Sequence, residues 1–149
     1  MKVLVTGASG YICWQLAEEL SAVGYDVTCM VRNAARAPQL HCPQIKFVEA
    51  DALQAETLPP ALNGIDVAYY LIHSMSGRVG GFELRDRQAA HNFAVAAKQC
   101  GVRRVIYSGW TGGDWSLGFS ASQEPARNGR GVAKIWAASG RGAGRHHRW

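Results

Sequence analysis

A glycine-rich turn near the start of the chain constrains the fold more than any other feature. Residues 6–13 read TGASGYIC and stand between a short apolar run, residues 2–6, and an amphipathic stretch, residues 10–23. Gly7 permits a tight turn, and Gly10 lets the backbone approach a pyrophosphate with no Cβ in the way. The helix that begins there would point free N–H groups at the anion. The pattern predicts a strand, a phosphate-binding loop and a helix; the alternative is a turn that binds no ligand.

Strand-like and helix-like segments alternate through residues 1–108. The expected strands cover residues 2–6, 26–31, 45–49, 66–72 and 103–108, and the expected helices cover residues 10–23, 54–62 and 82–100. The first expected helix has an apolar face made of Ile12, Leu16, Leu20 and Val23. Such alternation predicts an α/β, Rossmann-type three-layer fold with a parallel sheet in the strand order 3-2-1-4-5. A ligand crevice would then lie beyond the carboxyl ends of the first and fourth strands, where the order reverses.

The residues that follow the expected strands supply candidate contacts to a dinucleotide. An ordinary NAD site has an acid after its second strand, whereas this chain has Arg32, with Arg36 nearby. A guanidinium there would bind a 2′-phosphate, which predicts NADP(H) rather than NAD(H); the alternative is a solvated surface arginine. Asp51, after the third strand, could accept a hydrogen bond from adenine or be a turn aspartate. His73, after the fourth strand, could touch cofactor or substrate or be structural.

Taken together, these motifs resemble the atypical short-chain dehydrogenase/reductases, in particular the NmrA-like and complex-I-accessory-subunit-like NAD(P)-binding proteins. The resemblance covers about residues 1–108, through the segments VTGASGYI, VRN, EADAL, AYYLIHSM and ERDRQAAHNFAVAAKQCGVRRVIY. It implies a Rossmann fold, a bound NADP(H) or NAD(H) and often no well-defined reaction. The implied cofactor contacts are Gly7, Ser9, Gly10, Tyr11 and Ile12 in the phosphate loop, Arg32 at the 2′-phosphate, Asp51 and Ala52 at the adenine, and Leu71, Ile72 and His73 at the ribose.

Two departures from the family pattern bear on function. Cys13, followed by Trp14, stands where the family has its third loop glycine, which permits close packing of helix on strand. The chain also has no Tyr-x-x-x-Lys pair, because Thr111 stands four residues after Tyr107. In the family the tyrosine of that pair is the usual acid for reduction and the lysine lowers its pKa, so no catalytic residue is assigned here. We therefore expect either an oxidoreductase acting on an unknown small molecule or a non-catalytic dinucleotide sensor or assembly factor.

Residues 109–149 form a tail of different composition. They hold 9 of the 17 glycines and 4 of the 5 tryptophans, and 6 of the 16 basic residues against 2 of the 11 acidic ones. We expect a poorly ordered tail with at most one short helix near residues 132–139. The chain would thus be a truncated member with a tail read from a shifted frame or a degenerate gene end. The outer edge of the fifth strand would need cover from this tail or from a second copy in a homo-oligomer.

Composition narrows the remaining classes of function. The basic tail contains no basic helix and no recognised nucleic-acid module, so no nucleic-acid partner is predicted. None of the four cysteines forms a C-x-x-C pair or stands at zinc-ligand spacing from a histidine, which predicts no metal site and small thiols in a reducing compartment. No apolar stretch approaches the roughly 20 residues of a membrane helix, and we expect no signal peptide, because the apolar run at residues 2–6 is only five residues long and ends in a glycine turn. We expect a cytoplasmic protein without a membrane span.

Overall fold

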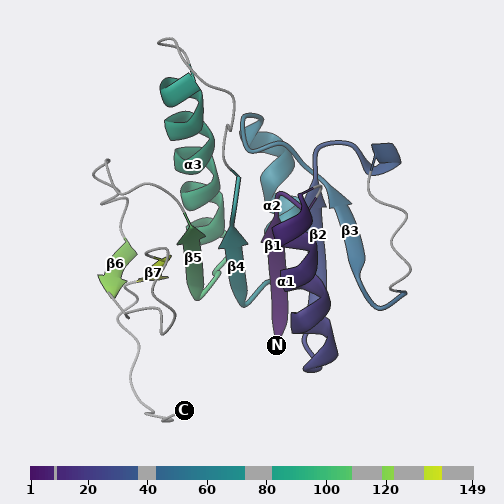
Figure 1. Ribbon diagram of the computed structural model, residues 1–149. Coiled ribbons are helices and arrows are strands. Elements are labelled where there is room, and N and C mark those ends of the chain that lie inside the picture. Colours follow the sequence, from purple (N-terminus) through teal and green to yellow (C-terminus); the bar gives the residue numbers. More distant parts are fainter. Residues whose placement is uncertain (9, 37–42, 73–81, 109–118, 123–132, 139–149) are drawn as a thin grey trace.

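The computed structural model describes residues 1–8, 10–36, 43–72, 82–108, 119–122 and 133–138, which form a sheet with helices on both faces (Figure 1). Its elements are, in chain order, β1 (Lys2–Thr6), α1 (Tyr11–Ala22), β2 (Asp26–Val31), the 3₁₀ turn η1 (Ala34–Arg36), β3 (Lys46–Glu49), the 3₁₀ turn η2 (Ala55–Thr57), α2 (Leu58–Leu62), β4 (Val67–Tyr70), α3 (Phe82–Gln99), β5 (Arg104–Ser108), β6 (Phe119–Ser122) and β7 (Ala133–Ala138). The bounds of the first five strands agree with the expected ones to within two residues.

The sheet has the strand order β3-β2-β1-β4-β5-β7-β6. Its first five strands are all parallel, which confirms the predicted order 3-2-1-4-5. Strand β1 is central: Val3 is in register with Val27 of β2 on one side and with Val67 of β4 on the other. The strand order therefore reverses between β1 and β4, and the carboxyl ends of these two strands meet beside the glycine-rich turn.

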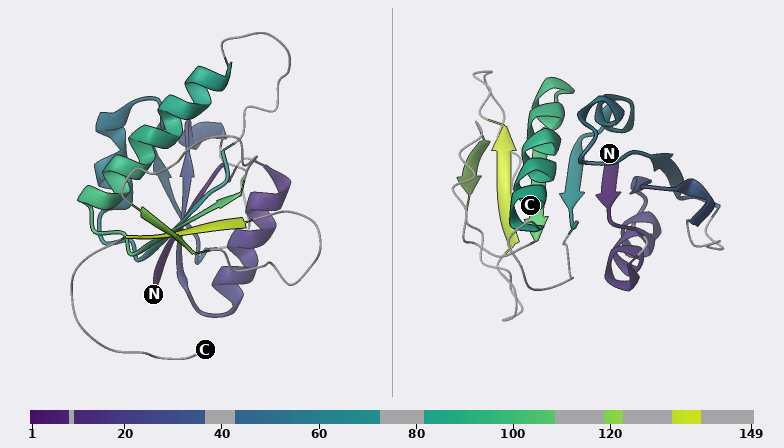
Figure 2. Two further views of the ribbon diagram at one scale, coloured as in Figure 1. Left: turned by 90° about the vertical axis from the view of Figure 1, so that its left-hand side faces the viewer. Right: turned by 90° about the horizontal axis from the view of Figure 1, so that it is seen from above.

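Two hydrophobic clusters fill the two faces of the sheet. Along β1, Val3 and Val5 belong to the cluster under α1, whereas Leu4 belongs to the cluster under α2 and α3. This alternation follows from the two-residue period of a strand, and it leaves β1 covered on both faces, as is usual for parallel sheets. Figure 2 shows α1 on one side of the sheet and α2 with α3 on the other. On α3, Ala89, Phe93, Ala96 and Ala97 are all buried, so one face of this helix packs on the sheet.

The buried face of α1 differs from the expected one. Ile12 and Val23 were expected to face the sheet, but they are 76% and 68% exposed. The buried residues of this helix are Cys13, Ala17 and Ser21. Leu16 and Leu20, which lie beside these residues, are only partly buried against the cluster. Small side chains at a spacing of four let the helix lie close to the sheet, and a pattern weighted by side-chain hydrophobicity misses them.

The tail contributes two strands, which corrects the expectation of a short helix near residues 132–139. There β7 pairs antiparallel with β5, and β6 pairs antiparallel with β7. The pairing satisfies the backbone N–H and C=O groups along the outer edge of β5, so a strand is favoured over an isolated helical turn. The edge that seemed to need cover is therefore covered by the chain itself. The remainder of the tail, expected to be poorly ordered, lies outside the described residues.

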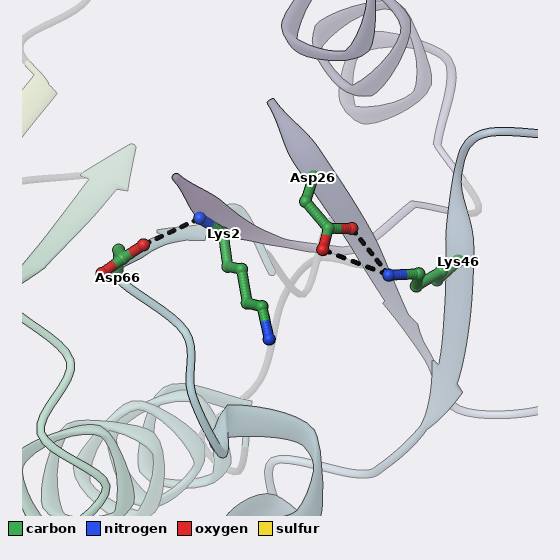
Figure 3. Close-up of polar contacts among 4 residues, drawn as sticks. All are labelled: Lys2, Asp26, Lys46 and Asp66. Atoms are coloured by element: carbon green, nitrogen blue, oxygen red, sulfur yellow. Dashed lines mark hydrogen bonds and ion pairs between the residues drawn. The ribbon is translucent and has the colours of Figure 1, made fainter. Parts of the chain in front are cut away.

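Polar contacts join the strands at their amino ends, at the edge of the sheet opposite the glycine-rich turn. The Lys2 backbone N–H donates to Asp66 Oδ2 at 2.8 Å, and Lys46 Nζ lies 2.9 Å from Asp26 Oδ1 (Figure 3). Arg103 donates to the other Asp66 oxygen at 2.8 Å. The pKa of Asp66 is held below its usual value, chiefly by the hydrogen bond from the Lys2 N–H and also by the Arg103 guanidinium. These contacts bring the starts of neighbouring strands together and leave the carboxyl ends for a ligand.

Candidate functional site

The glycine-rich turn has the geometry that the sequence predicted. Gly7 has a φ of +72°, which a residue with a Cβ adopts only with strain. The Gly10 N–H donates to the Gly7 carbonyl at 2.9 Å, which closes the turn, and the Trp14 N–H donates to the Gly10 carbonyl at 3.1 Å, which starts α1. A Cβ on Gly10 would lie 3.4 Å from the Gly7 carbonyl oxygen. Ser9, the other predicted loop contact, lies outside the described residues.

The start of α1 faces outward from this turn. Tyr11 and Ile12 are each 76% exposed, and their N–H groups, in the first turn of the helix, have no carbonyl four residues earlier within the helix to bond. No acidic residue occupies the first turn, and none of the described side chains caps the helix. The partial positive charge of the helix start is therefore available to an anion, which is the property expected of a pyrophosphate-binding loop.

Cys13 lies beneath the turn rather than in its mouth. Its thiol is buried, and Sγ is 3.5 Å from the point where a Cβ on Gly7 would stand. Burial raises the pKa of this thiol, so it packs as a neutral group. The neighbouring Trp14 packs against the same cluster under α1. The missing third glycine is thus accommodated because the Cys13 side chain packs into the cluster under α1, on the protein side of the turn.

The end of β4 is held directly beside the turn. Thr6, at the end of β1, is fully buried, and its Oγ1 accepts a hydrogen bond of 2.9 Å from the Leu71 N–H. The Leu71 carbonyl oxygen is so close that a Cβ on Gly7 would lie 3.3 Å from it. Leu71 and Ile72 are half-buried at this place. The structure therefore brings Leu71 to the loop, whereas Ile72 packs against the cluster under α2 and α3 and His73 lies outside the described residues.

The end of β2 carries Arg32, which is exposed and directly follows the strand. The chain then turns into η1: the Ala35 N–H donates to Asn33 Oδ1 at 2.9 Å, and the Ala34 N–H donates to Glu49 Oε2 at 3.0 Å. Sequence reasoning missed Glu49, although the parallel register could have indicated it, because Glu49 of β3 is paired with Val31 of β2. A cation and an anion therefore share this end of the sheet.

The end of β3 forms a tightly bonded turn. Asp51 Oδ1 accepts a hydrogen bond of 2.9 Å from the Leu53 N–H, which is the contact of a turn aspartate. Ala52 is only 3% exposed, and its carbonyl accepts a hydrogen bond of 3.0 Å from Asn92 Nδ2 on α3. Asn92 is a second residue that sequence reasoning missed, since 40 residues separate it from its partner. Helix α3 thereby holds the turn at which the adenine contact was expected.

Two tyrosines lie near the carboxyl ends of β4 and β5, on the side of the sheet that α3 covers. The rings of Tyr70, at the end of β4, and Tyr107, near the end of β5, are stacked with centroids 5.7 Å apart. Burial raises the pKa of both phenols, so both are neutral at physiological pH. A Tyr-x-x-x-Lys pair that began at Tyr107 would need a lysine at position 111; Thr111, which stands there, lies outside the described residues.

Two further properties concern only the part of the chain that the structure describes. In it, no group of three or more His, Cys, Asp or Glu side chains is placed to hold a metal ion. None of its helices is both long enough and apolar enough to cross a membrane.

Comparison with known proteins assigns the family. Residues 7–140 match the sequence profile of a family described as NAD(P)H-binding. The chain belongs to this NAD(P)H-binding family. The matched segment begins at the first glycine of the turn and extends past residue 108, where the resemblance noted in the sequence ended, to include β6 and β7. That the tail is read from a shifted frame stays a hypothesis.

Individual relatives of this NAD(P)H-binding chain differ in what they do. It is 32% identical to the photosystem II assembly factor Ycf39 of Cyanophora paradoxa, over 72% of this chain and 33% of that protein. It is 41% identical to a 3-diazoavenalumate denitrifying reductase of a Streptomyces species, over 71% of this chain and 36% of that protein. A structure of the NADPH-dependent quinone oxidoreductase QOR2 of Escherichia coli, complexed with NADPH, superposes with a TM-score of 0.60 at 27% identity, over 72% of this chain and 36% of that one. The chain spans about a third of the length of these relatives.

Proposed function

We propose that this chain binds a nicotinamide dinucleotide across the crevice between β1 and β4, and that it prefers NADP(H) to NAD(H). The observation that carries the proposal is the closed turn from Gly7 to Gly10, with the open start of α1 on one side and the Leu71 strand end on the other. The pyrophosphate would accept hydrogen bonds from the N–H groups of Tyr11 and Ile12. A fit is supported by the missing Cβ atoms at both glycines, which let the turn close against the Leu71 carbonyl and Cys13 and so place the start of α1 at the end of β1.

The preference for NADP(H) rests on Arg32. Its exposed side chain follows β2, at the place where the adenosine ribose of a dinucleotide lies in this fold. A guanidinium can bind the 2′-phosphate with two hydrogen bonds and stack on the adenine. The likeness to a quinone oxidoreductase complexed with NADPH supports the same preference. At the adenine we propose Asp51 and the backbone of Ala52, and at the ribose Leu71, Ile72 and His73.

For the reaction, we propose a hydride-transfer oxidoreductase that acts on an unknown small molecule. When bound, the nicotinamide would supply or accept the hydride. The likeness to a reductase and to a quinone oxidoreductase supports this proposal. The alternative is a non-catalytic dinucleotide sensor or assembly factor, of the NmrA-like kind, which the absent Tyr-x-x-x-Lys pair and the likeness to an assembly factor favour. We also propose a cytoplasmic location, because Cys13, Cys29 and Cys100 are free thiols. We propose no nucleic-acid partner. A homo-oligomer stays open to test.

One titration series tests the proposal. The purified chain is titrated with NADPH, NADH and single-stranded DNA while its fluorescence is followed, and tighter binding of NADPH with no response to DNA is expected. Arg32→Ala should abolish the preference for NADPH. Arg104→Ala, at the opposite end of the sheet, is the matched control and should preserve it. A selectivity unchanged in Arg32→Ala would refute the assignment, and turnover of carbonyl or quinone compounds would separate the enzyme from the sensor.

A further inference from the structure

Strand β3 brings a carboxylate to the end of β2. Glu49 is the last residue of β3 and is in register with Val31, the last residue of β2. Its Oε2 accepts a hydrogen bond of 3.0 Å from the Ala34 N–H, which follows Arg32 by only two residues. Glu49 is exposed, so burial does not require this contact. The side chain reaches over the end of its own strand to the segment that carries the arginine.

This position matters because of the ordinary chemistry of the second strand. Where a Rossmann-type site is selective for NAD, an acid after β2 binds the ribose hydroxyls and repels a 2′-phosphate. In this chain β2 ends without an acid, and Arg32 follows it instead. Glu49 supplies the missing acid from the neighbouring strand. A phosphate bound by Arg32 would share this end of the sheet with that carboxylate, and exposed charges act on each other over roughly the Debye length, about 8 Å at physiological ionic strength.

We infer that Glu49 is a specificity-determining residue whose negative charge opposes the 2′-phosphate and limits the preference for NADPH that Arg32 creates. The inference rests on the proposed function, since it concerns the dinucleotide of that same site. A 2′-phosphate must either bind beside the Glu49 carboxylate or displace it from the Ala34 N–H. NADH carries a hydroxyl at that position and meets neither cost.

A purely structural role for Glu49 is the competing explanation, and one substitution separates the two. Glu49→Gln keeps an oxygen that can accept the Ala34 N–H and removes the charge. If the side chain only holds the turn, this variant should bind both dinucleotides as the wild type does. If its charge acts on the ligand, the ratio of the two dissociation constants must change. Glu19→Gln, an exposed acid on α1, is the control for loss of one negative charge from the surface.

The test is a titration of the whole chain with NADPH and with NADH at low and at high salt. We expect Glu49→Gln to shift the selectivity towards NADPH by about fivefold to tenfold, the size expected of one charge near a phosphate at an exposed site. The shift should shrink in 1 M salt, where the Debye length is about 3 Å, and Glu19→Gln should show none. Selectivity equal to that of the wild type would overturn this inference alone. Failure of the wild type to bind either dinucleotide would overturn the proposed function as well.

Discussion

The hydrogen bond from the Leu71 N–H to Thr6 Oγ1 should hold the end of β4 beside the glycine-rich turn, and its removal can be tested directly. Thr6→Val replaces the hydroxyl by a methyl group of nearly the same shape, so it opens no cavity. It leaves the Leu71 N–H without the acceptor that now lies 2.9 Å away. An unpaired buried donor costs about 1–3 kcal/mol, and because this bond is part-buried we expect the free energy of unfolding to fall by about 1–2 kcal/mol.

Thr6→Ser is the matched control for this substitution. It keeps the hydroxyl and loses one buried methyl group, which should also cost about 1 kcal/mol. Both variants should therefore unfold at lower urea concentration than the wild type. Only Thr6→Val releases the end of β4, so only it should weaken dinucleotide binding, by about tenfold if roughly 1.4 kcal/mol of positioning is lost.

Three measurements decide the matter: urea unfolding, dinucleotide titration and the hydrogen-exchange rate of the Leu71 amide. Faster exchange at Leu71 and weaker binding in Thr6→Val, with neither change in Thr6→Ser, is the expected result. Equal loss of binding in both variants would show that general destabilisation is responsible. Unchanged exchange at Leu71 in Thr6→Val would refute the reasoning, because the bond would then contribute nothing to holding this strand end.

Two other predictions concern the turn and the opposite end of the sheet. Gly7→Ala should lower the free energy of unfolding by about 1–2 kcal/mol through its left-handed φ, and it should also abolish dinucleotide binding. Gly24→Ala is the matched control, because Gly24 has a φ of +90° and no atom lies within 4 Å of the new Cβ. It should lose similar stability in urea unfolding but bind the dinucleotide normally. Equal binding by the two variants would contradict this. Because the folded-state pKa of Asp66 is lowered, its contribution is complete above the unfolded value of about 3.9 and is lost as pH falls through the folded value. The difference in urea midpoint between wild type and Asp66→Asn should therefore shrink below about pH 4; a constant difference would contradict the assignment.

Local patterns in the sequence were enough to predict the first five strands, the turn and the parallel order. A positive φ at Gly7, a run of β-branched residues in β1 and the 3.6-residue period of α3 each depend on neighbours within a few positions. The phosphate loop and the end of β4 were therefore placed correctly beside each other. The predicted buried face of α1 was wrong at Ile12, because the helix approaches the sheet through Cys13 and Ala17. Hydrophobicity alone does not reveal how closely two elements will pack.

The contacts that shape the candidate site came only from the tertiary structure. Glu49 reaches Ala34 across 15 residues, Asn92 reaches Ala52 across 40, and Leu71 reaches Thr6 across 65. None of these pairs has a local pattern, because each partner is chosen by strand register and helix packing. The same holds for β7, which is a strand because the open edge of β5 pairs with it. By itself the sequence predicted where a dinucleotide would lie; the assembled sheet decided which side chains surround that place and what charge they carry.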